Sequence, residues 1–100
     1  MVKYNKLVRD KIPEYLDSKG VSYEKRIVND AEYKEELIKK LDEEVKEFIE
    51  DKNIEELADI VEVVEALKKL SEFSEIEKIR IEKLEEKGGF GKKIVLKGEK

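Results

Sequence analysis

Two pairs of carboxylates carry the chemistry that this sequence offers. Glu44 and Glu47 stand three residues apart, and Glu56 and Asp59 repeat that spacing shortly afterwards. Residues three apart project from the same face of an α-helix, so each pair would present two carboxylates together. Two such pairs facing each other would surround one point with oxygen ligands. That donor set suits a hard divalent cation such as Mg²⁺ or Mn²⁺.

The helical phase of these pairs sets them apart from the surrounding acid. At about 100° per residue, Glu44 falls about 20° from Leu37, inside the apolar stripe of its segment. Glu56 falls between Val63 and Leu67 in the next segment. Other acidic residues point away from both stripes; these are Glu43, Glu50, Glu55 and Glu65. Because a carboxylate in an apolar stripe costs free energy unless a cation lies beside it, the phase favours a metal between the two helices.

Each of these carboxylates also has a purely structural interpretation. Glu56 follows Asn53 by three residues, which is the spacing of a helix capping box. Glu44 and Glu47 could instead pair with lysines such as Lys40 on a solvated face. For any one residue alone these alternatives stay open. The repeated spacing on adjacent helices favours the metal site.

Composition excludes several kinds of chemistry. The 100 residues include no Cys and no His, so disulfides, zinc ribbons, thiol nucleophiles and imidazole bases are absent. Catalysis would depend on carboxylates, lysines, arginines, tyrosines or metal-activated water. There is no apolar run of membrane-spanning length and no hydrophobic signal region, so we expect a cytoplasmic protein without a membrane partner. The abundance of Lys, Glu and Ile is typical of thermophile proteins.

The distribution of charge suggests the kind of ligand. A net charge of −4 argues against a nucleic-acid partner, since such a domain should be basic overall. Basic residues concentrate near the two ends of the sequence, and most of the acid lies between them. Basic segments folded over an acidic metal centre would suit a small polyphosphate.

The expected elements are mainly helical. Asp10 is placed to cap a helix through Ser18, with Pro13 in its first turn. Three further helices are expected over residues 30–51, 53–70 and from Ser71 or Ser74 to 87, with Asp30 and Asn53 as caps of the first two. Short extended arms are expected at residues 21–28 and 91–96, and the two arms could pair with each other. Residues 4–8 form an entry segment.

The last of these helices carries a cationic group. Arg80 projects among apolar residues, and Lys83 and Lys87 fall within about 60° of it. A guanidinium in such a stripe needs an anion, either a helix carboxylate or a phosphate. For either lysine alone, the favoured interpretation is a stem that lies along apolar surface with its charge in water.

Four stretches of the chain together resemble a known family. They are residues 4–13 (YNKLVRDKIP), 43–48 (EEVKEF), 55–60 (EELADI) and 88–90 (GGF). In this order they are similar to the all-α nucleotide pyrophosphohydrolases, which include the MazG-like and phosphoribosyl-ATP pyrophosphohydrolase-like proteins.

The resemblance implies a fold, a reaction and an oligomer. The fold would be an antiparallel bundle of about four helices, with residues 1–100 as a single MazG-like domain and a homodimer or homotetramer as the assembly. Mg²⁺, with Mn²⁺ as the alternative, would be held by Glu44, Glu47, Glu56 and Asp59. The reaction would be hydrolysis of a nucleoside triphosphate or related nucleotide to the monophosphate and pyrophosphate, a house-cleaning activity.

The remaining roles are hypotheses from residue type and position. Glu62, one turn after Asp59, would complete the metal shell, and Glu44 or Glu47 would be the general base. The expected phosphate ligands are cationic; they are Lys6, Arg9, Arg80, Lys83 and Lys87. Two other classes remain open: a nucleotide-binding protein without turnover, and a helical oligomerisation module whose carboxylates pair with arginine and lysine.

Overall fold

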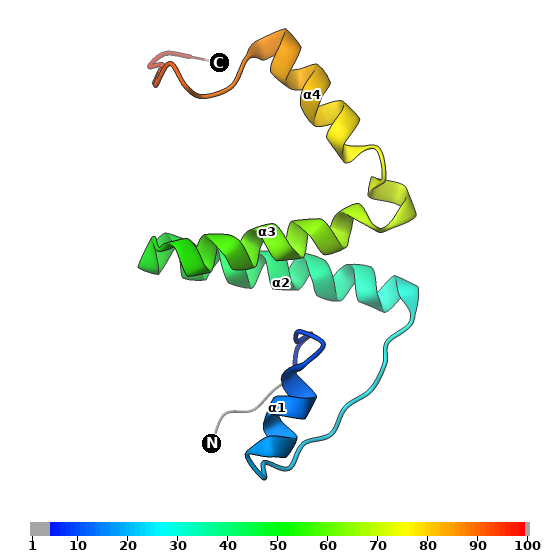
Figure 1. Cartoon of the computed structure of the whole chain (residues 1–100). Coiled ribbons are helices and arrows are strands. Elements are labelled where there is room, and N and C mark those ends of the chain that lie inside the picture. Colours follow the sequence, from blue (N-terminus) through cyan, green and yellow to red (C-terminus); the bar gives the residue numbers. More distant parts are fainter. Residues whose placement is uncertain (1–4, 100) are drawn as a thin grey trace.

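The computed structural model describes residues 5–99, and within them the chain is all-α (Figure 1). The elements are α1 (Ile12–Ser18), α2 (Asp30–Asp51), α3 (Ile54–Lys68), a 3₁₀ turn η1 (Ser71–Phe73) and α4 (Ile76–Lys87). The prediction of an all-α fold with about four helices is confirmed. Residues 1–4 and 100, including Tyr4 of the expected entry segment, lie outside the described residues.

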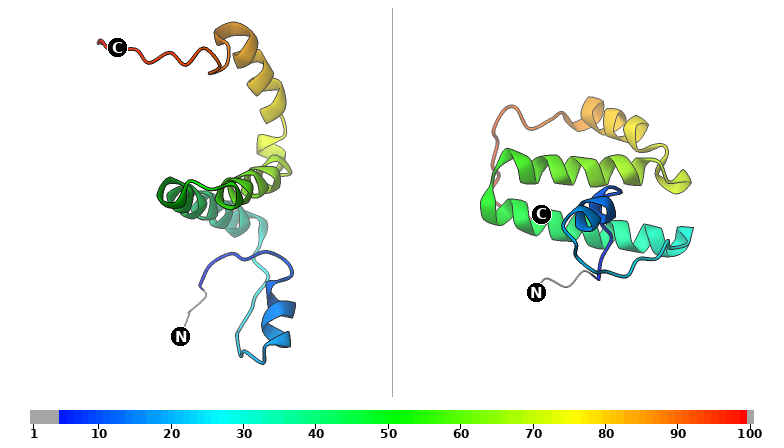
Figure 2. Two further views of the ribbon diagram at one scale, coloured as in Figure 1. Left: turned by 60° about the vertical axis from the view of Figure 1, so that its left-hand side comes forward. Right: turned by 60° about the horizontal axis from the view of Figure 1, so that its bottom comes forward.

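The centre of the fold is the hairpin of α2 and α3, which lie side by side and antiparallel (Figures 1 and 2). Lys52 turns the chain between them in the left-handed conformation, with φ 50° and ψ 36°. Asn53 then caps α3 by accepting a hydrogen bond from the Glu56 N–H at 2.9 Å. A two-residue turn therefore holds the first turn of α3 beside the last turns of α2.

Asn53 is the predicted cap, but two other predicted caps are wrong. Asp10 does not cap α1, because the N–H that it would have accepted three residues later belongs to Pro13, which has none. Asn29 rather than Asp30 caps α2, accepting from the Glu32 N–H at 2.9 Å. Asp30 is instead the first helical residue, where the helix dipole favours a carboxylate.

The last helix begins later than predicted. Ser71 opens the 3₁₀ turn, and α4 starts at Ile76 after Glu75 in the cap position. Its end is as predicted, since Gly88 follows Lys87 with a φ of 80° that favours glycine.

The segments outside the hairpin project to its two sides. The N-terminal segment and α1 lie on one side, whereas α4 and the tail that follows it lie on the other (Figures 1 and 2). Residues 21–28 form neither a helix nor a strand, and no strand forms anywhere in residues 5–99. The predicted pairing of this arm with residues 91–96 is therefore wrong, because the hairpin lies between the two segments.

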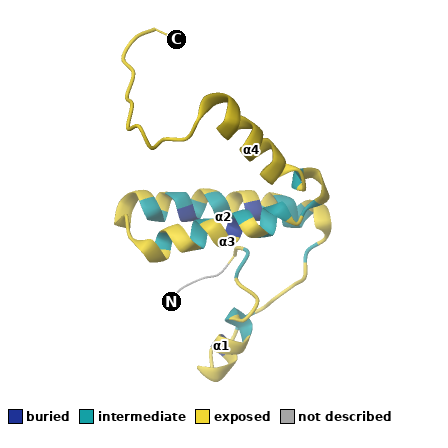
Figure 3. Cartoon of the chain, turned by 45° about the horizontal axis from the view of Figure 1, so that its top comes forward, coloured by how far each residue is buried: buried dark blue, intermediate teal, exposed yellow. Residues whose placement is uncertain are grey.

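Little of the chain is buried. The buried apolar residues are Leu16, Leu37 and Val63, and Glu44 is buried with them, while α4 is exposed along its whole length (Figure 3). The Cα radius of gyration is 17.7 Å, whereas a compact domain of this length would have about 13 Å. None of the helices in residues 5–99 is long and apolar enough to cross a membrane.

Candidate metal centre

Three of the predicted metal ligands come together between α2 and α3. One carboxylate oxygen from each of Glu44, Glu56 and Asp59 lies within 4.8 Å of the others. The arrangement follows from the hairpin: Glu44 lies near the C-terminal end of α2, and Glu56 and Asp59 share one face of the first turns of α3. Because the helices run antiparallel around a short turn, these two ends face each other.

The cluster contains buried oxygens that the described residues leave unpaired. Glu44 is only 5% exposed; its Oε1 lies 3.2 Å from the Lys40 ammonium, but its Oε2 has no hydrogen-bond partner in residues 5–99. The Oε2 atom of Glu56 is likewise buried and without a partner within that range. A buried polar group without a hydrogen-bond partner costs roughly 1–3 kcal/mol, and a charged group costs more. A divalent cation coordinated at this point would satisfy both, so these residues fit Mg²⁺ or Mn²⁺.

The capping-box interpretation of Glu56 is only half met. Asn53 accepts the backbone hydrogen bond from Glu56, but the hydrogen bonds of the described residues include none from the Asn53 N–H back to the Glu56 carboxylate. The side chain of Glu56 is turned toward the cluster instead of the helix terminus.

The surroundings of Glu44 shift the pKa of its carboxyl group. Burial is the largest influence and raises the pKa of Glu44 above its ordinary value. The ion pair with Lys40 opposes this rise, and the negative charge of Glu47 adds to it. The site therefore holds a carboxylate that binds a proton more readily than an exposed glutamate does.

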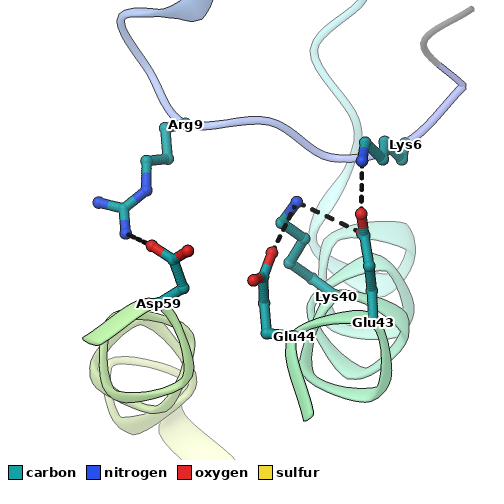
Figure 4. Close-up of polar contacts among 6 residues, drawn as sticks. All are labelled: Lys6, Arg9, Lys40, Glu43, Glu44 and Asp59. Atoms are coloured by element: carbon teal, nitrogen blue, oxygen red, sulfur yellow. Dashed lines mark hydrogen bonds and ion pairs between the residues drawn. The ribbon is translucent and has the colours of Figure 1, made fainter. Parts of the chain in front are cut away.

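Two of the predicted cationic residues lie over the cluster. The N-terminal segment crosses the hairpin so that Arg9 Nη2 donates to Asp59 Oδ1 at 2.7 Å (Figure 4). Lys6 on the same segment donates to Glu43 of α2 (Figure 4). A cavity of about 420 Å³ lies between this segment and the hairpin, lined on the hairpin side by Glu44 and Asp59 among others. Basic and acidic groups thus face each other across a space that could admit phosphates.

Glu47 and Glu62 lie near the cluster without joining it. Glu47 is half-buried one turn after Glu44 and acts on it through its charge, but it is not one of the three converging carboxylates. Glu62 is exposed and lines the cavity.

Glu43 was not identified as a site residue from the sequence, and Lys40 was named there only as a structural partner of Glu44 and Glu47. Lys40 is placed between carboxylates, 3.3 Å from Glu43 Oε2 and 3.2 Å from Glu44 Oε1 (Figure 4). Its four-residue spacing from Glu44 was the available signal. Glu43, which helical phase turns away from the apolar stripes, is half-buried because Lys6 covers it.

The cationic residues of α4 are not brought to the cluster. Arg80 donates through Nε to Glu77 at 2.8 Å, so its anion in this chain is a helix carboxylate. Lys83 and Lys87 are exposed on the same helix. Of the five predicted phosphate ligands, Arg9 contacts the cluster at Asp59 and Lys6 lies beside it on Glu43, whereas these three lie on a helix that projects away from it (Figure 1).

Comparison with family models, with curated proteins and with solved structures gives no significant match in any of the three. The resemblance to nucleotide pyrophosphohydrolases therefore rests on the sequence motifs alone, and the chemistry must be inferred from the residues of this chain.

If the cluster binds a metal, binding should depend on Glu56 and not on the adjacent residue Glu55. Glu56→Gln should weaken Mg²⁺ or Mn²⁺ binding by about tenfold or more, since it removes an anionic ligand at a buried point. Glu55→Gln changes the same charge at the adjacent, exposed position and should have little effect. Isothermal titration calorimetry of the two variants and the wild type measures this difference. Equal affinities for all three proteins would show that the ion does not bind at Glu56.

The contact between Lys6 and Glu43 predicts a pH-dependent contribution to stability. Burial alone would raise the pKa of Glu43, but hydrogen bonds and charge from Lys6 and Lys40 outweigh it and lower the pKa below its ordinary value. Stability from this carboxylate is therefore present above the unfolded pKa of about 4.5 and is lost as the pH falls through the lower folded pKa. The pair is partly exposed, so its contribution should be below about 1 kcal/mol.

The comparison is between the wild type and Glu43→Gln, with the free energy of unfolding measured by urea denaturation at one protein concentration. The wild type should be the more stable protein near neutral pH, and the gap should narrow as the pH falls below about 4.5 and through the lowered pKa of folded Glu43. A gap that stays constant across this range would contradict an electrostatic role for Glu43.

Proposed function

We propose that this chain is a Mg²⁺-dependent nucleotide pyrophosphohydrolase that acts in the cytoplasm as a homo-oligomer, with Mn²⁺ as an alternative metal. The substrate would be a nucleoside triphosphate or related nucleotide, and the products the monophosphate and pyrophosphate. The observation that carries the proposal is the convergence of Glu44, Glu56 and Asp59, with unpaired buried oxygens on the two glutamates. The motifs around these residues support the choice of reaction.

The charges around the cluster suit a metal with a polyphosphate. Three carboxylates converge there, and Lys40 and Arg9 each pair with one of them. A divalent cation added to this group would leave an excess of positive charge, which the phosphates of a nucleotide would balance. Arg9 contacts Asp59 through Nη2, and its planar guanidinium has further donors suited to phosphate oxygens. Lys6 would supply a second cation from the same segment.

In the proposed reaction the protein orients a water molecule and takes its proton. The water oxygen forms a bond to the α-phosphorus, the bond from that phosphorus to the bridging oxygen breaks, and pyrophosphate leaves with that oxygen. Glu44 or Glu47 accepts the proton of the water; the raised pKa of Glu44 suits this role. Bound Mg²⁺ would neutralise phosphate charge in the transition state. Glu44, Glu56 and Asp59 would hold it, with Glu47 and Glu62 nearby.

In this proposal the cationic residues of α4 can bind phosphate only at the site of another copy of the chain. In the described arrangement α4 does not reach the cluster of its own chain (Figure 1). We therefore assign Arg80, Lys83 and Lys87 to phosphate binding across a contact between copies, where they would meet the acidic hairpin of a neighbour.

A helical oligomerisation module is the second candidate, and one observation favours it. Two carboxylates of the cluster already pair with basic residues of this chain, Glu44 with Lys40 and Asp59 with Arg9. In such a module the pairs would be structural, and neither Mg²⁺ nor a chelator would change stability. A nucleotide-binding protein without turnover would share the ligands and differ only in releasing no pyrophosphate.

Pyrophosphate release separates these candidates. The purified chain should release pyrophosphate from at least one member of a panel of normal and modified nucleoside triphosphates and phosphoribosyl-ATP, in Mg²⁺ but not in chelator. Glu56→Gln should lower kcat/KM by about 10²-fold or more, because it removes a ligand of the metal that stabilises the transition state.

Glu55→Gln is the matched control and should keep full activity, since its side chain is exposed and lies outside the cluster. Circular dichroism should show that both variants keep the helical content of the wild type. If the folded, metal-binding protein released pyrophosphate from no member of the panel, the hydrolase would be excluded, and nucleotide binding without turnover would remain. If the protein neither released pyrophosphate nor bound metal, the helical oligomerisation module would be favoured.

A further inference from the structure

Lys40 is the least exposed of the three cations that lie beside the acidic cluster. Its side chain is 17% exposed, whereas those of Lys6 and Arg9 are 44% and 57% exposed. The ammonium lies 3.2 Å from Glu44 Oε1 and 3.3 Å from Glu43 Oε2, on the side of the hairpin that the N-terminal segment crosses (Figure 4). Charges interact more strongly where little water screens them, so Lys40 acts directly on any ion that binds at the cluster.

Lys40 also lines the space that a ligand would enter. The cavity of about 420 Å³ is bounded by Lys40 together with Glu44, Asp59 and Arg9. A lysine ammonium has three N–H donors. Within residues 5–99 the ammonium of Lys40 contacts two carboxylate groups, those of Glu43 and Glu44. A donor is therefore left for an anion in the cavity, and phosphate oxygens accept such charge-assisted hydrogen bonds.

The two partners of Lys40 differ in their relation to the cluster. They follow it by three and four residues on α2, so both project beside it. Glu44 is one of the three converging carboxylates, whereas Glu43 lies outside the cluster and also accepts from Lys6. If a metal takes Glu44, Lys40 keeps Glu43 as a partner and stays at the edge of the cavity.

A divalent cation and Lys40 would compete for Glu44. An ammonium 3.2 Å from Glu44 Oε1 repels a second cation bound to the same carboxylate. An anion placed between the two cations removes that repulsion. A phosphate group is such an anion, since its oxygens can accept from the ammonium while others balance the charge of a metal. The charge of Lys40 therefore opposes binding of metal alone and favours binding of metal together with phosphate.

We infer that Lys40 is a phosphate-binding residue, which holds Glu44 until a metal is bound and then donates to a phosphate oxygen of the nucleotide. This inference rests on the metal centre of the proposed function and adds a residue to its substrate site. By this exchange Lys40 strengthens the coupling between metal and polyphosphate, so that each raises the affinity of the protein for the other. Glu43 has a positioning role, because it retains the ammonium beside the cavity.

The test is isothermal titration calorimetry of the full chain with two probes, Mn²⁺ alone and inorganic pyrophosphate at saturating Mn²⁺. Lys40→Met removes the charge and keeps an unbranched side chain. This variant should bind Mn²⁺ alone about tenfold more tightly and pyrophosphate about tenfold more weakly than the wild type, because the same charge repels one probe and attracts the other. A merely structural lysine would weaken both affinities when it is replaced.

Lys39→Met is the matched control for this measurement. The Lys39 side chain is 74% exposed and pairs with Glu36, so the variant should bind both probes as the wild type does. A Lys40→Met protein that bound pyrophosphate as tightly as the wild type, or that lost its affinity for Mn²⁺, would overturn the inference.

Amine labelling of the wild type keeps the test decisive if Lys40→Met fails to fold. Acetic anhydride labels lysines, and mass spectrometry gives the rate at each position. Mn²⁺ alone should raise the labelling rate of Lys40 severalfold, because its contact with Glu44 is broken, and pyrophosphate should lower that rate again. Lys39 should respond to neither probe. Unchanged labelling of Lys40 in protein that binds Mn²⁺ would overturn the inference and leave the metal centre standing, whereas a wild type that binds no Mn²⁺ would overturn both.

Discussion

The burial of a carboxylate between two antiparallel helices is the constraint on which the rest of this structure depends. Glu44 occupies a position in α2 that helical phase gives to the core, beside buried Leu37. Its charge is costly there, and Glu56 and Asp59 bring two more carboxylates to the same point. Cations that enter this space offset that cost. Lys40 and Arg9 do so from within the chain, and the oxygens that they leave unpaired define the place where a metal fits.

This constraint also explains the path of the N-terminal segment. Residues 5–11 form no helix, yet Lys6 and Arg9 attach the segment to α2 and α3 at separate points. The segment therefore closes one side of the cavity above the carboxylates. In the proposed function the same two side chains would also meet the phosphates of a nucleotide.

The long helices and the centre of the site could be predicted from the sequence because both follow from periodicity. The three-residue spacing of Glu56 and Asp59, combined with the cap at Asn53, fixes where their carboxylates point once α3 forms. The ion pair between Lys6 and Glu43 could not be predicted in the same way, since it depends on where the N-terminal segment crosses α2. The pair between Lys40 and Glu44 follows instead from their four-residue spacing. The projection of α4 away from the hairpin could not be predicted either. Ile76 and Ile81 lie about 140° apart around it, so the apolar stripe expected around Arg80 is not a single face, and the helix is exposed along its whole length.

The central claim is that the carboxylate cluster is a metal site, and the most direct measurement is crystallographic. Crystals grown or soaked with Mn²⁺ would be measured at a wavelength where manganese scatters anomalously. The account predicts a strong peak within bonding distance of Glu44, Glu56 and Asp59, at about 2.0–2.2 Å from their oxygens. A cluster without a peak, with the Lys40 ammonium still beside Glu44 at saturating metal, would contradict it.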